Sequence, residues 1–107
     1  MNNNWDMQKI ANWNEFKFSM NNKFNQFEKT EEEAEEYYEA TTKEEKSEEY
    51  ADVYIAFAGL SRFSISAKLV CETIERLPEW ADIKKYVEAK MQINTMREFD
   101  ENMHHKD

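Results

Sequence analysis

The stretch "SEEYADVYIAFAGL", residues 47–60, decides how we expect this chain to fold. From Tyr50 to Leu60 every residue is apolar or small except Asp52. An ionised carboxylate inside such a run is costly to bury unless another group pairs with it. The first question that the sequence raises is therefore which group compensates the charge of Asp52.

The direction in which Asp52 points follows from the helical repeat, which turns each residue by about 100°. Glu49 and Asp52 then lie on the same side of their helix as the apolar stripe. That stripe carries Val53, Ala56, Leu60 and Phe63. This helix is therefore expected to direct two carboxylates, spaced i and i+3, toward the interior.

The acidic run "EEEAEEYYEA", residues 31–40, gives a matching result. An acidic run is usually a solvated face, yet the same rotation places Glu33 and Glu36 on the side of Tyr37 and Ala40. The other four glutamates are predicted to face water: Glu31, Glu32, Glu35 and Glu39. An antiparallel hairpin of the two helices would bring the two inward pairs opposite each other.

Four converging carboxylates repel one another, which raises their pKa values or opens the fold unless a cation is bound. Oxygen ligands without His or Cys suit Mg²⁺, Mn²⁺ or Ca²⁺. Mg²⁺ also takes ligands from substrate phosphates. The pattern thus favours a divalent metal site over the alternative, a partly solvated end of a helix bundle.

Lys90, Asn94 and Arg97 are spaced i, i+4 and i+7, so they form one stripe on a later helix. This stripe continues the line of Ile83 and Val87, and the helix face changes from apolar to cationic along its length. Two interpretations stay open at this point. The stripe faces a polyphosphate, or it forms ion pairs with the acidic helices.

The apolar spacing predicts an all-α fold in a single domain, residues 1–107. Four helices are expected over residues 4–27, 31–40, 46–76 and 79–99, and the asparagine content of the first indicates a break near Asn21 and Asn22. Thr30 and Glu33 form a capping box at the start of the second helix. The tail, residues 100–107, is expected to be frayed. The economical arrangement is an antiparallel bundle of about four helices, completed by oligomerisation.

Composition excludes several classes of protein. The chain has one Gly and one Pro, which disfavours sheets and excludes glycine-rich phosphate loops, so any nucleotide must be bound by side chains. The single cysteine, Cys71, excludes an intrachain disulfide and is expected to be an ordinary helix residue in a reducing compartment. The sequence contains no signal-peptide pattern and no run long enough to span a bilayer, so we expect a cytoplasmic protein without a membrane partner.

The charge is concentrated in one segment. Residues 28–52 hold 12 acidic and 3 basic residues, whereas the remaining residues hold 11 of each, so the net charge of −9 comes from this segment. Such a field disfavours nucleic-acid binding and favours a cation or a basic partner. An acidic helical interaction protein, which mimics nucleic-acid charge or inhibits a basic partner, is therefore an alternative function. It does not explain a carboxylate pair inside an apolar run.

Three motifs together resemble those of the MazG-like all-α nucleoside triphosphate pyrophosphohydrolases. The stretches "EEAEEYYEA" and "EEYADVYIAFAGLSRF" resemble the E-x-x-E and E-x-x-D signature of that superfamily, and "KMQINTMREF" is similar to its K-M-x-I-N-x-x-R stretch. The resemblance covers about residues 24–99. The chain departs from the pattern at Glu35, where a small residue often precedes the second Glu, and its amino-terminal segment matches poorly.

The resemblance implies hydrolysis of a nucleoside or deoxynucleoside triphosphate to the monophosphate and pyrophosphate, by a homodimer or homotetramer. Mg²⁺, with Mn²⁺ as a substitute, would be bound by Glu33, Glu36, Glu49 and Asp52. The phosphate and nucleotide contacts would be Lys90, Asn94 and Arg97. Glu33 or Glu36 would position or deprotonate the attacking water.

Two further groups of residues have competing interpretations. Aromatic residues of the first helix would stack on the base or simply belong to the core; the candidates are Trp13, Phe16 and Phe27. A di-iron carboxylate bundle needs Glu-x-x-His pairs on core helices. The only histidines are His104 and His105, which we expect to be solvated tail residues, so this class is rejected.

Overall fold

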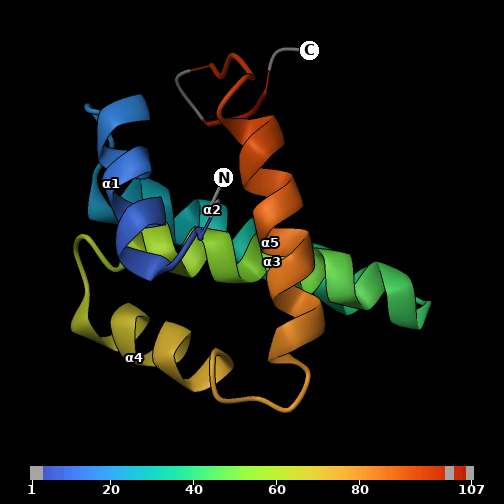
Figure 1. Ribbon diagram of the computed structural model, residues 1–107. Coiled ribbons are helices and arrows are strands. Elements are labelled where there is room, and N and C mark those ends of the chain that lie inside the picture. The colour runs from blue at the N-terminus through green and yellow to red at the C-terminus, as the bar shows by residue number, and fades with distance from the viewer. Residues whose placement is uncertain (1–3, 101–102, 106–107) are drawn as a thin grey trace.

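The computed structural model describes residues 4–100 and 103–105. This part of the chain forms α1 (Met7–Lys17), α2 (Lys23–Glu39), α3 (Lys43–Leu60), α4 (Ile65–Ile74) and α5 (Trp80–Asn94) (Figure 1). The strand-type pairing recorded in it is one isolated bridge between Phe99 and His105, so the all-α class is confirmed for the described residues. None of the helices described here has the length and apolar content needed to cross a membrane.

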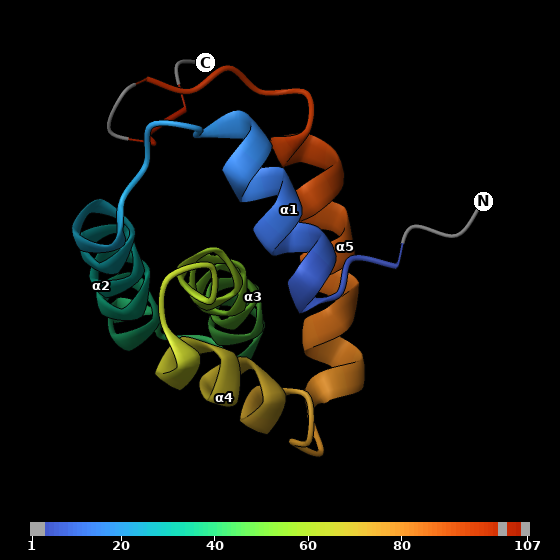
Figure 2. The same ribbon diagram turned by 90° about the vertical axis from the view of Figure 1, so that its left-hand side faces the viewer.

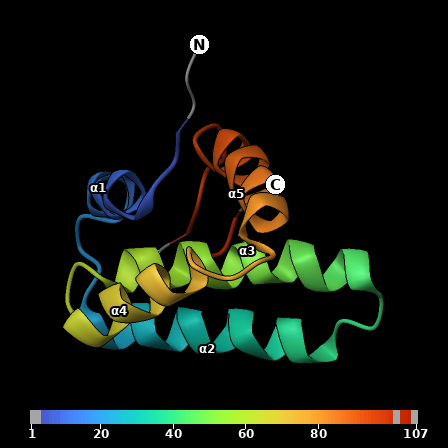
Figure 3. The ribbon, with the colours of Figure 1, turned by 60° about the horizontal axis from the view of Figure 1, so that its bottom comes forward.

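Helix α3, which contains the stretch quoted first, lies at the centre of the molecule. Figure 2 looks nearly along α3, with α2 on one side, α1 and α5 on the other and α4 below. Helices α2 and α3 form an antiparallel hairpin, joined by residues 40–42 (Figure 3). Helix α5 crosses α3 steeply instead of running along it (Figure 1). The hairpin expected from the sequence is thus present.

The central position of α3 follows from its small and apolar residues. Ala51, Tyr54 and Ala58 are fully buried, and they belong to one core cluster. The other helices contribute the remaining members: Ile10 from α1, Cys71 and Ile74 from α4, and Ile83, Val87 and Met91 from α5. A helix that is apolar on most of its circumference is buried on most sides, which explains why four helices surround α3.

The predicted first helix, residues 4–27, is two helices, and the break that its asparagine content indicated near Asn21 and Asn22 is present. Helix α1 ends at Lys17, and α2 begins at Lys23 with Asn22 as its cap, where the backbone N–H of Asn25 donates to Asn22 Oδ1 at 2.8 Å. Thr30 does not start a helix: it is buried within α2, and its hydroxyl donates to the carbonyl of Gln26 at 2.7 Å.

The predicted third helix, residues 46–76, is also two helices. Helix α3 starts earlier, at Lys43, because Thr42 caps it and accepts a hydrogen bond from the backbone N–H of Glu45 at 3.1 Å. It ends at Leu60, and α4 begins after its own cap, Ser64. The fourth predicted helix, residues 79–99, corresponds to α5 and ends five residues earlier than expected, at Asn94.

Candidate active site

A cavity of about 740 Å³ lies between the α2–α3 hairpin and α5. Its lining contains all seven residues that the sequence singles out for metal or phosphate binding: Glu33, Glu36, Glu49, Asp52, Lys90, Asn94 and Arg97. The carboxylates come from the hairpin, and the cationic and amide groups come from α5 and the segment after it. One wall of the cavity is therefore acidic and the opposite wall is cationic.

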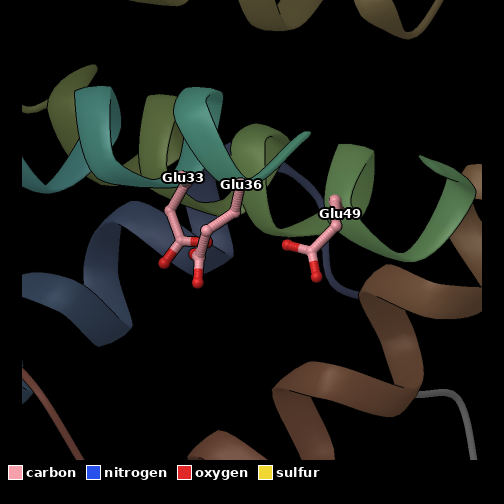
Figure 4. A group of neighbouring side chains, drawn as sticks. All are labelled: Glu33, Glu36 and Glu49. Atoms are coloured by element: carbon pink, nitrogen blue, oxygen red, sulfur yellow. The ribbon is translucent and has the colours of Figure 1, made fainter. Parts of the chain in front are cut away.

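Three of the four carboxylates gather closely. Glu33 and Glu36 project from successive turns of α2, and Glu49 projects toward them from α3 (Figure 4). Glu33 and Glu49 are half-buried, whereas Glu36 is exposed to water, contrary to the inward position predicted for it. One carboxylate oxygen from each lies within 4.8 Å of the others. Oxygens that share one Ca²⁺ or Mg²⁺, at about 2.0–2.6 Å from the ion, are at most about 5 Å apart. The donor set and its spacing fit a hard divalent cation.

The fourth carboxylate, Asp52, has a different partner. The ammonium of Lys90 donates to Asp52 Oδ2 at 3.0 Å, and the two side chains are only 25% and 28% exposed. Solvent therefore screens this ion pair less than a surface pair. Of the two interpretations of the α5 stripe, the ion pair with an acidic helix is the one that Lys90 adopts here.

The fold opposes the ionisation of Glu33, Glu49 and Asp52. Burial, followed by the nearby charge of Asp52, raises the pKa of Glu33 from 4.5 to about 8, although Lys29 lies 3.2 Å away and lowers it. Burial also raises the pKa of Glu49, and it raises the pKa of Asp52 despite the ammonium of Lys90. A cation bound among them would stabilise the charged forms.

The cationic wall continues the buried face of α5, as the sequence predicts. Ile83 and Val87 are buried in the core, and Lys90 and Asn94 follow one and two turns later at the cavity. Arg97 lies beyond the end of α5, yet it still lines the cavity and is only partly exposed. The three residues thus lie on the same wall although the helix ends between them.

The aromatic residues considered for base stacking differ in their position relative to the cavity. Trp13 lines the cavity, whereas Phe16 and Phe27 are exposed and lie outside its lining. Two aromatic residues that the sequence did not indicate join Trp13: Phe18 and Phe99 pack edge-on against it, with ring centroids 5.6 and 6.1 Å away. Phe18 was missed because the predicted helix continued through it, whereas it caps the end of α1.

Buried amides form another part of the lining that the sequence did not indicate. Asn14 Nδ2 donates to Gln26 Oε1 at 3.2 Å, and Gln26 Nε2 donates to the carbonyl of Ala56 at 3.0 Å. The guanidinium of Arg62 donates to Asn14 Oδ1 at 2.6 Å. This network ties α1, α2 and α3 together at the cavity. A Gln or Asn within a polar helix gives no signal of such a role.

Described residues of the predicted tail lie at the cavity. His104 Nε2 lies 3.0 Å from Glu32 Oε1, Met103 is buried, and both histidines line the cavity although they are exposed. Glu32, with Glu35 and Glu39, is exposed as expected but also reaches the cavity. The rest of the predicted tail, residues 101–102 and 106–107, lies outside the described residues.

Cys71 is an ordinary core residue, as expected from the sequence. Its side chain is fully buried in α4, and its thiol lies 3.9 Å from the carbonyl oxygen of Tyr54. Burial raises the pKa of the Cys71 thiol to about 12, which keeps it protonated at neutral pH.

Comparisons with protein-family models, with curated proteins and with solved structures found no match for this chain. The resemblance to MazG-like enzymes therefore stays a prediction that rests on three sequence motifs. What the fold adds is the arrangement of those motifs, since residues from all three line one cavity.

Proposed function

We propose that this protein is a Mg²⁺-dependent nucleoside triphosphate pyrophosphohydrolase, which converts a nucleoside or deoxynucleoside triphosphate to the monophosphate and pyrophosphate. The observation that supports it is the pairing of an acidic wall, from the α2–α3 hairpin, with a wall carrying Lys90, Asn94 and Arg97 in one cavity. A triphosphate that carries a divalent cation presents the complementary charges to both walls.

The metal ligands in this proposal are Glu33, Glu36, Glu49 and Asp52. Mg²⁺, or Mn²⁺ in its place, supplies Lewis-acid stabilisation of phosphate charge and lowers the pKa of a bound water. The carboxylates contribute oxygen ligands from the hairpin. Because burial raises the pKa of Glu33 to about 8, a cation that binds there at neutral pH displaces a proton from this carboxyl group.

Hydrolysis adds water across the anhydride between the α and β phosphates: one phosphorus–oxygen bond forms and the bridging bond breaks. We assign to Glu33 or Glu36 the positioning of this water and the acceptance of its proton. Lys90 and Arg97 stabilise the negative charge that builds up on the phosphates, and the Asn94 amide orients them. Trp13 is the described aromatic candidate for stacking on the base.

The first experiment is a panel of common nucleoside and deoxynucleoside triphosphates with Mg²⁺ and with Mn²⁺, analysed for monophosphate and pyrophosphate. We expect at least one substrate to be cleaved, and Glu49→Gln to lower kcat/KM by at least about 100-fold, as removal of a metal ligand does. Glu31→Gln is the matched control, because Glu31 is an exposed glutamate of α2 outside the cavity lining. Absence of product across the whole panel would refute the proposal.

We also propose that two or four copies assemble, which would complete the helix bundle expected from the sequence. A second, apolar groove of about 410 Å³ lies between α2, α3 and α4, and exposed apolar side chains lie in its lining, among them Tyr38 and Leu69. Contacts between copies would cover these side chains.

The alternative function, an acidic interaction protein, has one observation in its favour. Glutamates of α2 outside the closely spaced metal group are exposed, including Glu31, Glu35 and Glu39. Such a protein would bind a basic partner through this surface and would release no pyrophosphate, so the substrate panel separates the two functions.

A further inference from the structure

The ion pair between Lys90 and Asp52 joins the two walls of the cavity. It links α5 to α3 across 38 residues of sequence, with Nζ and Oδ2 3.0 Å apart. Asp52 belongs to the proposed metal ligands, and Lys90 belongs to the proposed phosphate contacts. In this conformation Asp52 and Lys90 therefore pair with each other, instead of Asp52 binding a metal cation and Lys90 binding a phosphate.

The two sets of contacts compete for electrostatic reasons. A divalent cation on either oxygen of Asp52 would lie within about 7 Å of an ammonium held by the same carboxylate, and like charges at that distance repel. A cation on Asp52 also supplies the charge compensation for which the buried carboxylate otherwise depends on Lys90. When Asp52 loses Lys90 as its partner, the bound cation therefore takes over the compensation of its negative charge.

The charge of Lys90 extends beyond Asp52. It also lowers the pKa of Glu49 against the effect of burial, so this ammonium compensates carboxylates from two successive turns of α3. A similar arrangement exists at the neighbouring carboxylate, where Lys29 lies 3.2 Å from Glu33. Lysine ammonium groups therefore occupy positions from which they balance the acidic wall.

We propose that Lys90 exchanges partners during binding: it is the counter-ion of Asp52 until a divalent cation binds there, and it then turns to the phosphates of the substrate. This inference rests on the proposed function, and it adds a coupling between the metal and the triphosphate. The cation makes Lys90 available to the phosphates, and by linkage a bound triphosphate favours the cation.

A double-mutant cycle with Mn²⁺ and no nucleotide tests the exchange. Metal affinity is measured by calorimetry for the wild type, Lys90→Met, Asp52→Asn and the double variant. We expect Lys90→Met to bind Mn²⁺ about 2- to 10-fold more tightly, in the range found for coupled neighbours, and this gain to vanish in the Asp52→Asn background. Lys85→Met is the control, because it removes an exposed ammonium from the same helix outside the cavity.

Each other result has a definite meaning. An equal gain in both backgrounds would mean that Lys90 acts only through its general field, which overturns the exchange. Unchanged or weaker binding in Lys90→Met would mean that Lys90 stays on Asp52 beside the metal, which also overturns it. In both cases the wild type would still release pyrophosphate, so the proposed function would survive. No binding of Mn²⁺ by the wild type would overturn both.

A second measurement reports on the released lysine without any metal. Inorganic triphosphate is titrated in EDTA against Asp52→Asn and Glu49→Gln, each of which removes one negative charge from the acidic wall. Only the first variant frees Lys90 from its ion pair, so we expect it to bind triphosphate more tightly than Glu49→Gln does. Equal affinities would overturn the exchange, and melting curves of both variants verify that they are folded.

Discussion

Among single residues, Glu33 shows most clearly how the fold shapes the chemistry of the site. Its carboxylate is largely enclosed by the cavity wall and lies near Asp52 and Glu36, which accounts for its pKa of about 8. The i,i+3 spacing in the sequence was sufficient to predict that Glu33 faces inward. Its distance from Glu49 and the ion pair of Asp52 depend on how three helices pack, so they could not be predicted from spacing.

Glu33 should make the stability of the protein depend on pH when no metal is present. Because its pKa is raised from 4.5 to about 8 on folding, the folded state binds more protons between these values, so the free energy of unfolding should fall as pH rises from about 4.5 to 8. Glu49 and Asp52 act in the same direction. Urea denaturation in EDTA across this range measures the slope, and Glu33→Gln should reduce it. A slope that Glu33→Gln leaves unchanged would contradict this assignment.

At the scale of helices, the apolar pattern predicted which segments are helical better than it predicted the residues at which the helices begin and end. Residues 50–60 and 80–94 were predicted as helical because their apolar spacing is continuous, and both are. The break after Leu60 was missed because Gly59 alone is compatible with a continuous helix and no Pro lies near it, and the Ser64 cap lacks the acidic residue that completes a capping box. Thr30 and Glu33 match a capping box and therefore predicted the start of a helix, but both residues lie inside α2.

Gly59 is the position where helix propensity and packing disagree. A Cβ there would lie 2.7 Å from Asn14 Nδ2 and 2.9 Å from Gln26 Nε2, both held in the buried amide network. We expect Gly59→Ala to lower the free energy of unfolding by about 1 kcal/mol, because overpacking outweighs the gain in helix propensity. Thermal or urea denaturation measures it. The loss of stability caused by Gly59→Ala should be smaller in an Asn14→Ala background. A Gly59→Ala protein that is more stable than the wild type would contradict the prediction, because it would show that the buried amides move aside at little cost.

At the scale of the whole molecule, charge and apolar surface lie on different parts of the fold. The acidic hairpin faces the cavity, whereas the apolar groove lies where α2, α3 and α4 meet. The sequence predicted the first arrangement, because the acidic residues cluster in one segment. It could not locate the groove, because helix α4 was predicted as a continuation of α3 and not as a separate helix.

The groove leads to an expectation about assembly. Light scattering after size exclusion should show a dimer or tetramer, and Leu69→Glu should dissociate it by placing a charge in the apolar contact. Met20→Glu is the control, because Met20 is an exposed apolar residue outside the groove lining. A monomer at all concentrations, or an assembly that Leu69→Glu leaves intact, would contradict this interface.

The hairpin has a consequence for the order in which the chain acquires its structure. All four carboxylates lie within residues 33–52, whereas Lys90 follows Asp52 by 38 residues. Contacts that are local in sequence form sooner than distant ones. The acidic wall is therefore expected to assemble before α5 docks, at a stage when its repulsion is not yet balanced by Lys90. A divalent ion present during folding would relieve that repulsion early, and it would accelerate folding more than it slows unfolding.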